Sequence, residues 1–82
     1  MYNTLPTPVE IMPRIKALKE SMGKNFIDYK IMKQDGRVDI VQVTTTLRPS
    51  LRMLEACDRI MDTHNITFDH QTLDHYVLNF MY

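Results

Sequence analysis

The sequence predicts a small α+β domain made of one helix, a two-stranded antiparallel β-hairpin and then two more helices. Three observations predict this order. An Asp-Gly pair separates two stretches rich in β-branched and aromatic residues, a capping box precedes an apolar stripe, and apolar residues recur at helical spacing near the C-terminus. A chain of 82 residues buries enough surface for one core, so residues 1–82 are expected to form a single domain.

The first helix has clear start and stop signals. Thr7-Pro8-Val9-Glu10 fits a capping box, and Gly23 can adopt the left-handed conformation that closes a helix. Pro13 lacks an amide hydrogen and crowds the preceding turn, which predicts either a kink or a short turn followed by a helix from Pro13 to Met22. The apolar stripe of this helix consists of Ile11, Ile15, Leu18 and Met22.

A β-hairpin is expected from Phe26 to Thr46. Its turn is Asp35-Gly36, because this pair suits the type I′ turn whose twist matches antiparallel strands. With these two residues at the centre of the turn, Ile31 lies opposite Ile40 on the face that packs against the helices.

The second face of the hairpin is expected to mix apolar and charged residues. In the same register Asp28 lies opposite Val43 and Lys30 lies opposite Val41. An isolated hairpin needs packing to be stable, and an apolar face left bare marks an interaction surface. We therefore predict that this face binds another protein. The predicted partner-binding residues are Phe26, Met32, Val41 and Val43.

Two helices are expected after the hairpin. The first runs from Pro49 to His64 and stops at Asn65, which tolerates the left-handed position at a helix end. Asp69 is expected to cap the second. The apolar residues that predict the second helix are Leu73, Tyr76, Val77, Phe80 and Met81. The alternative is a third strand through His75 to Tyr82, which would pair with the hairpin and remove much of the case for an external partner.

Charge and cysteine usage favour a cytoplasmic protein that does not insert into membranes. No apolar run approaches the ~18 residues of a membrane span, and residues 1–8 lack the pattern of a signal peptide. Cys57 is the single cysteine, as expected in a reducing compartment. The formal net charge is zero. The alternative function, a small nucleic-acid-binding regulator, lacks the usual basic footprint.

Metal binding and catalysis have no complete signature. His70 and Asp74 would share a helix face at a chelating spacing, but no second histidine or Cys-x-x-Cys supports a metal site. Cys57 lies on the apolar side of its helix, which predicts an inert core thiol rather than a nucleophile. Asp58 and Asp62 are expected on a solvated acidic face. The sequence therefore predicts no metal, no cofactor and no enzymatic activity. The histidines, for which capping and surface roles are expected, are His64, His70 and His75.

These observations favour a regulator or inhibitor that acts by binding another protein or by forming a homo-oligomer. The sequence opens with Met1-Tyr2-Asn3-Thr4-Leu5-Pro6-Thr7-Pro8, contains seven methionines and shows no export signal. In these features it resembles the cytoplasmic lysis-inhibition accessory proteins (antiholins) of T-even phages. The resemblance implies binding to the cytoplasmic part of a holin in order to delay lysis.

Overall fold

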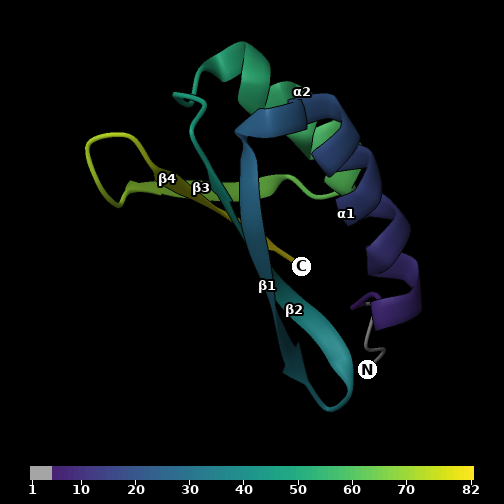
Figure 1. Cartoon of the computed structure of the whole chain (residues 1–82). Helices are drawn as coiled ribbons and strands as arrows, with labels where there is room; N and C mark the ends of the chain where they lie inside the picture. The colour runs from purple at the N-terminus through teal and green to yellow at the C-terminus, as the bar shows by residue number, and fades with distance from the viewer. Residues whose placement is uncertain (1–4) are drawn as a thin grey trace.

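Residues 5–82 are described by a computed structural model, in which two helices pack on one side of a four-stranded antiparallel sheet (Figure 1). The strand order in the sheet is β1-β2-β4-β3. In chain order the elements are α1 (Pro8–Met22), the 3₁₀ turn η1 (Gly23–Asn25), β1 (Phe26–Gln34), β2 (Arg37–Thr45), α2 (Leu51–Met61), β3 (Asn65–His70) and β4 (Tyr76–Met81). The fold is α+β, but the expected order of helix, hairpin and two helices is wrong. Residues 1–4, which open the segment that carries the phage resemblance, lie outside the described residues.

Helix α1 begins and ends where its sequence signals predict. Thr7 and Glu10 form the capping box, with the Glu10 amide donating to the Thr7 hydroxyl and the Glu10 carboxylate accepting from the Thr7 amide. Gly23 follows the helix with a φ of 60°. Pro13 lies inside one continuous helix, so the second of the two expected alternatives, a short turn followed by a helix from Pro13, is not found.

The hairpin of β1 and β2 confirms the predicted turn. Asp35 and Gly36 both have positive φ, at 53° and 77°, as a type I′ turn requires. The register agrees at Lys33 opposite Val38, and then shifts by one residue, so that Ile31 lies opposite Val41 instead of Ile40.

A β-bulge beside Asp39 causes this shift. Side chains alternate between the two faces of a strand, so Val38 could not share a face with Val41 and Val43 in a regular strand. The bulge changes the alternation once, and all three valines become fully buried on the helix side. A second irregularity at Ile27 restores the predicted pairing of Phe26 with Thr45.

Helix α2 is shorter than the expected range of Pro49 to His64. Ser50 caps it by accepting a hydrogen bond from the Met53 amide, and Asp62 ends it in the left-handed conformation. The predicted stop residue, Asn65, is instead the first residue of β3.

The last segment is β3 and β4, and the expected final helix is wrong. Tyr76, Leu78 and Phe80 alternate with Val77 and Asn79 along β4, and Leu78 and Phe80 are fully buried. The backbone of β2 needs hydrogen-bond partners on its second side, and β4 supplies them. Sheet pairing therefore outweighs the helical spacing. The predicted alternative, a third strand near the C-terminus, is confirmed for β4, while β3 was not expected.

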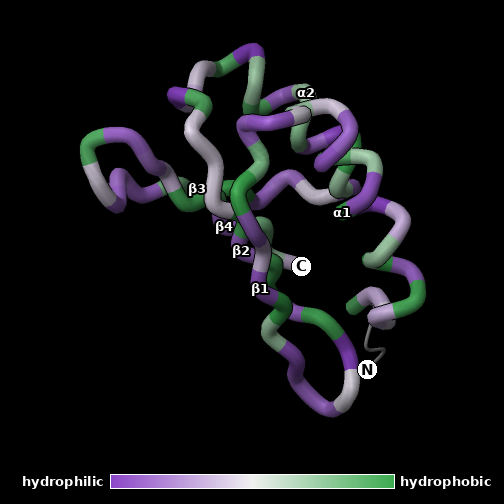
Figure 2. The backbone as a smooth tube through the Cα atoms, in the orientation of Figure 1, coloured by the Kyte–Doolittle hydropathy of each residue, from purple (hydrophilic) through white to green (hydrophobic). Residues whose placement is uncertain are grey.

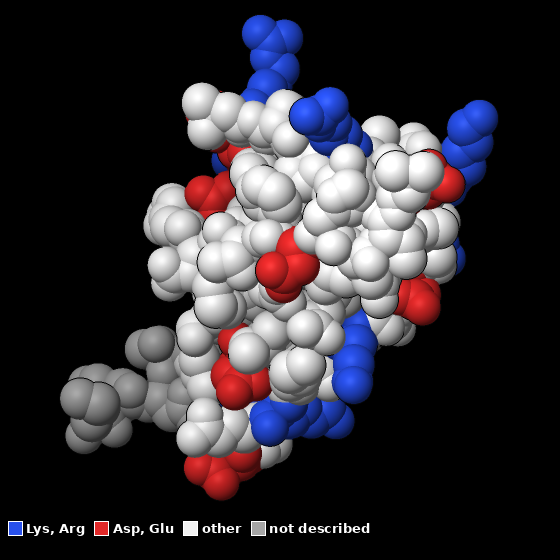
Figure 3. Space-filling model, turned by 90° about the vertical axis from the view of Figure 1, so that its left-hand side faces the viewer, with Lys and Arg blue, Asp and Glu red and all other residues white. Residues whose placement is uncertain are grey.

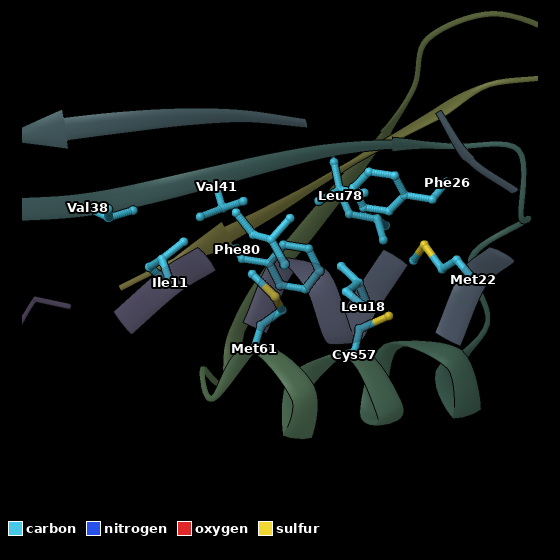
Figure 4. Close-up of a cluster of buried hydrophobic side chains, with 12 residues drawn as sticks. Ile11, Leu18, Met22, Phe26, Val38, Val41, Cys57, Met61, Leu78 and Phe80 are labelled. Carbon is cyan, nitrogen blue, oxygen red and sulfur yellow. The ribbon is translucent and has the colours of Figure 1, made fainter. Parts of the chain in front are cut away.

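The core lies between the helices and the helix side of the sheet (Figure 4). It contains the predicted stripe of α1 together with Phe26, Val38, Val41, Val43, Cys57, Met61, Leu78 and Phe80. Apolar and polar positions are interspersed along the helices and the strands (Figure 2). Within the described range, no helix is long and apolar enough to cross a membrane.

Candidate functional site

The four predicted partner-binding residues do not form one exposed surface. Phe26, Val41 and Val43 are buried in the core, and Met32 is half-buried on the opposite side of the sheet. The bare apolar face that motivated this prediction is covered by the protein's own helices. The inner edge of the hairpin is covered too, because β4 pairs with β2. These four residues therefore do not form an interaction site together.

The three histidines have local partners on the surface. His70 stacks on Tyr76 with ring centroids 4.6 Å apart, and the His75 Nδ1 atom lies 3.1 Å from the Thr72 hydroxyl. His70 and Asp74 do not share a helix, since this part of the chain is a strand and a loop. Among residues 5–82, no three His, Cys, Asp or Glu side chains are placed so that they could hold a metal ion together.

Cys57 is a core residue, as its place in the apolar stripe predicts. Its side chain is buried between α2 and the rest of the core, and burial raises the pKa of its thiol to about 11. A thiol with a raised pKa in an apolar site is a poor nucleophile, because only the thiolate attacks.

A shallow cleft beside α2 and β3 contains a pair formed by a histidine and a carboxylate. The His64 Nδ1 atom lies 3.1 Å from Asp58 Oδ2, and the His64 side chain is almost fully exposed. The residues that line this cleft are Leu51, Leu54, Glu55, Asp58, His64 and Ile66. None of these six lining residues carries a hydroxyl or thiol that the histidine could activate. Asp62 is not among these lining residues, and its Oδ2 atom lies 3.9 Å from an Arg14 guanidinium nitrogen.

The face of the sheet away from the helices is polar in its centre. Lys30, Gln42, Asn79 and Thr67 follow one another across the four strands. The Gln42 side chain donates to Asn79 at 2.9 Å, which in turn donates to Asp69 at 3.4 Å. Single-stranded nucleic acids bind such sheets by stacking bases on aromatic rings, and this row of side chains has none. Charges of both signs are also interspersed on the face drawn in Figure 3.

The outer edge of β1 is the longest unpaired sheet edge in the described structure. β1 has nine residues and pairs only with β2, whereas β3 at the other edge has six. Unpaired strand edges present a row of amides and carbonyls to other chains. The nine-residue edge of β1 therefore offers the larger template for strand addition.

The hydrogen-bond pattern shows which residues of β1 point outward. The Tyr82 amide donates to the Asp39 carbonyl at 2.8 Å, so beyond the bulge the odd-numbered residues Val41, Val43 and Thr45 bond towards β4. Thr44, Gln42 and Ile40 then bond towards β1, where they lie opposite Asp28, Lys30 and Met32. Hydrogen-bonding direction alternates along an antiparallel strand, so Tyr29 and Ile31 direct their amides and carbonyls to the open edge.

An apolar groove accompanies this edge on the helix side of the sheet. Its lining residues are Val9, Met12, Pro13, Ile15, Lys16, Lys19 and Tyr29, so it runs between α1 and β1. Val9 is 81% exposed, Met12 43% and Tyr29 41%, which leaves apolar surface in water. Two lysines stand on the rim. We call the outward backbone of β1 together with this groove the β1 edge site.

Sequence reasoning missed this site, although a signal for it was present. Val9, Met12, Lys16 and Lys19 recur at steps of three and four residues, which places them on one side of α1 that differs from the core stripe. What the sequence could not show is that β1 remains at the edge of the sheet while β2 becomes an interior strand.

Comparisons with protein-family models, with curated proteins and with solved structures found no match to this chain. The β1 edge site is the feature of the described structure that indicates a function.

Proposed function

We propose that this protein is a non-enzymatic, cytoplasmic regulator that binds another polypeptide by strand addition at the β1 edge site. The observation that carries the proposal is the coincidence of outward backbone groups at Tyr29 and Ile31 with an exposed apolar groove next to them. Main-chain hydrogen bonds provide affinity in this mode of recognition, and a neighbouring groove provides specificity for alternate side chains.

The groove defines the kind of segment that fits. A strand added beside β1 points every second side chain to the helix side, where Met12 and Tyr29 offer apolar contacts. The side chains between them face the polar side of the sheet near Asp28 and Lys30. An extended segment with alternating apolar and charged residues matches both faces.

The resemblance to phage antiholins suggests one specific regulator. In that form of the proposal, the added segment belongs to the cytoplasmic part of a holin, and binding delays lysis. The β1 edge site contains no motif that singles out a holin, so this partner enters the experiment as a candidate beside other cellular proteins.

A proline at the open edge tests the proposal. Tyr29→Pro removes an outward amide and places a ring on the edge, while the hydrogen bonds to β2 at Asp28 and Lys30 remain. Tyr29→Ala controls for loss of the aromatic ring. Phe68→Pro makes the matching change on the outer side of β3, where Phe68 is also exposed.

The assay is affinity capture from cell lysate with each immobilised variant, with bound proteins quantified by mass spectrometry and with purified holin cytoplasmic segment as a defined probe. Tyr29→Pro is expected to reduce capture at least about tenfold. The added strand loses a hydrogen bond to the Tyr29 amide, and the proline ring keeps its backbone away from the edge of β1. Phe68→Pro is expected to behave as the wild type. Equal capture by Tyr29→Pro and the wild type, with both proteins folded by circular dichroism, would rule out the β1 edge as the binding site.

A further inference from the structure

The sequence of β1 is complementary to itself when two copies run antiparallel. We propose that the chain added at the β1 edge site is a second copy of this protein, paired across a two-fold axis at Tyr29. This inference rests on the proposed function, because it names the partner of the same edge.

Charges on β1 select this register. In a two-fold antiparallel pair, residues at equal distances on either side of the axis lie opposite each other and share a face. With the axis at Tyr29, Asp28 lies opposite the partner's Lys30, and Lys30 lies opposite the partner's Asp28. An axis at Lys30 would place two lysines opposite each other. An axis at Ile31 would pair Lys30 with Met32, which leaves the charge without a counterion.

Backbone direction supports the same axis. Tyr29 points its amide and carbonyl outward, so the two copies of Tyr29 can exchange both hydrogen bonds. Asp28 and Lys30 then form non-hydrogen-bonded pairs with the partner, in which Cα atoms lie only about 4.5 Å apart and side chains are closest. The opposite charges meet at the positions where cross-strand contact is shortest.

Exposed apolar residues are covered by the same pairing. Tyr29 is 41% exposed, and in this register the two Tyr29 rings meet at the axis beside the groove of each copy. Lys16 and Lys19 occur on the rims of both grooves. Both side chains are exposed, so water and salt weaken their mutual repulsion.

The two-fold symmetry of this contact limits the assembly to a dimer. Pairing β1 with β1 joins two four-stranded sheets into one of eight strands, with β3 at both ends. A contact of this kind uses the same surface on both copies and closes as a dimer, whereas pairing β1 with β3 would continue into a filament.

Charge reversal provides the experiment, with sedimentation velocity of the full chain from micromolar to millimolar concentration as the readout. The wild type is expected to shift from monomer to dimer as concentration rises. Asp28→Lys sets lysines opposite lysines and Lys30→Asp sets aspartates opposite aspartates, so each variant alone is expected to dimerise at least about tenfold more weakly. An equimolar mixture restores an opposite charge at both positions, and is expected to form heterodimers with an affinity near that of the wild type.

Lys33→Asp is the matched control. It makes the same change of charge on the same strand, but in this register its position lies beyond the end of the partner's β1, which begins at Phe26. It is expected to dimerise within about twofold of the wild type, since no charge lies across from it. Thermal melts of each variant show whether it is folded under the conditions of the assay.

The outcomes separate this inference from the proposed function. A wild type that stays monomeric at millimolar concentration overturns self-pairing, and the β1 edge site itself still stands if Tyr29→Pro abolishes capture of another chain. Dimerisation of Asp28→Lys at wild-type affinity overturns the register at Tyr29, and growth into filaments overturns the two-fold contact. A monomeric wild type together with undiminished capture by Tyr29→Pro contradicts both proposals.

Discussion

The burial of Leu73 and Leu78 differs between the observed strand and the helix that the apolar spacing indicates. In a helix, Leu73 would belong to the buried stripe with Phe80, and Leu78 would lie outside it. In the structure, Leu73 is 86% exposed in the loop between β3 and β4, and Leu78 is fully buried in the core. Leu73→Ala and Leu78→Ala are therefore chemically identical changes with opposite expected effects.

The expected change in the free energy of unfolding follows from the burial of each side chain. Leu78→Ala removes three carbon groups from a buried site, which lowers the transfer contribution to the free energy of unfolding by about 2.4 kcal/mol. The cavity left between the sheet and the helices raises the total to about 3–5 kcal/mol. Leu73→Ala removes the same atoms from water-exposed surface and is expected to change the free energy by less than about 0.5 kcal/mol.

Urea unfolding followed by circular dichroism measures both changes. A slope of about 1 kcal/mol per molar urea suits a domain of this size, so Leu78→Ala is expected to lower the midpoint by about 3–5 M or to prevent folding. Leu73→Ala is expected to leave the midpoint almost unchanged. The opposite result, a large loss for Leu73→Ala with little change for Leu78→Ala, would refute the strand and support the helix.

Three further predictions concern the turn, the helix cap and the cysteine. Gly36 has a φ of 77°, so Gly36→Ala is expected to lower the free energy of unfolding by about 1–2 kcal/mol in urea titrations, and an unchanged midpoint would count against the left-handed turn. The backbone and side-chain hydrogen bonds of Thr7 lower the pKa of Glu10 below its ordinary 4.5. The stabilisation that results is complete above this pH and is lost as pH falls through the lowered pKa, so the melting temperatures of wild type and Glu10→Gln are expected to converge in acid. A gap that persists in acid would oppose this explanation. Cys57 is expected to react with a thiol reagent only at the rate of unfolding, because it is buried and its pKa is raised to about 11; immediate labelling of the native protein would show that the thiol is accessible.

Local signals predict the first half of the fold well. The Thr7–Glu10 capping box, the glycine after α1 and the Asp35-Gly36 turn each depend on a few adjacent residues, and the structure confirms all three. Register was predictable near the turn only. Three valines on one face of β2 required a bulge, and their uneven spacing was the signal for it.

The second half depends on contacts between distant residues. The residues from Tyr76 to Met81 satisfy both a helical stripe and a strand alternation, and the choice between them is made by the open side of β2. That choice also determines the candidate site. Once β4 joins β2, the expected face of the hairpin becomes core, and β1 becomes the edge where Tyr29 and Ile31 are free to pair.

Amide hydrogen exchange along β1 tests strand addition at the β1 edge most directly. In dilute monomer, the amides of Lys30 and Met32 bond to β2 and are expected to exchange slowly, while those of Tyr29 and Ile31 face water and exchange fast. When a second copy or another bound chain occupies the edge, Tyr29 and Ile31 are expected to become protected as well. Continued fast exchange at Tyr29 and Ile31 in the associated protein would contradict strand addition at this edge.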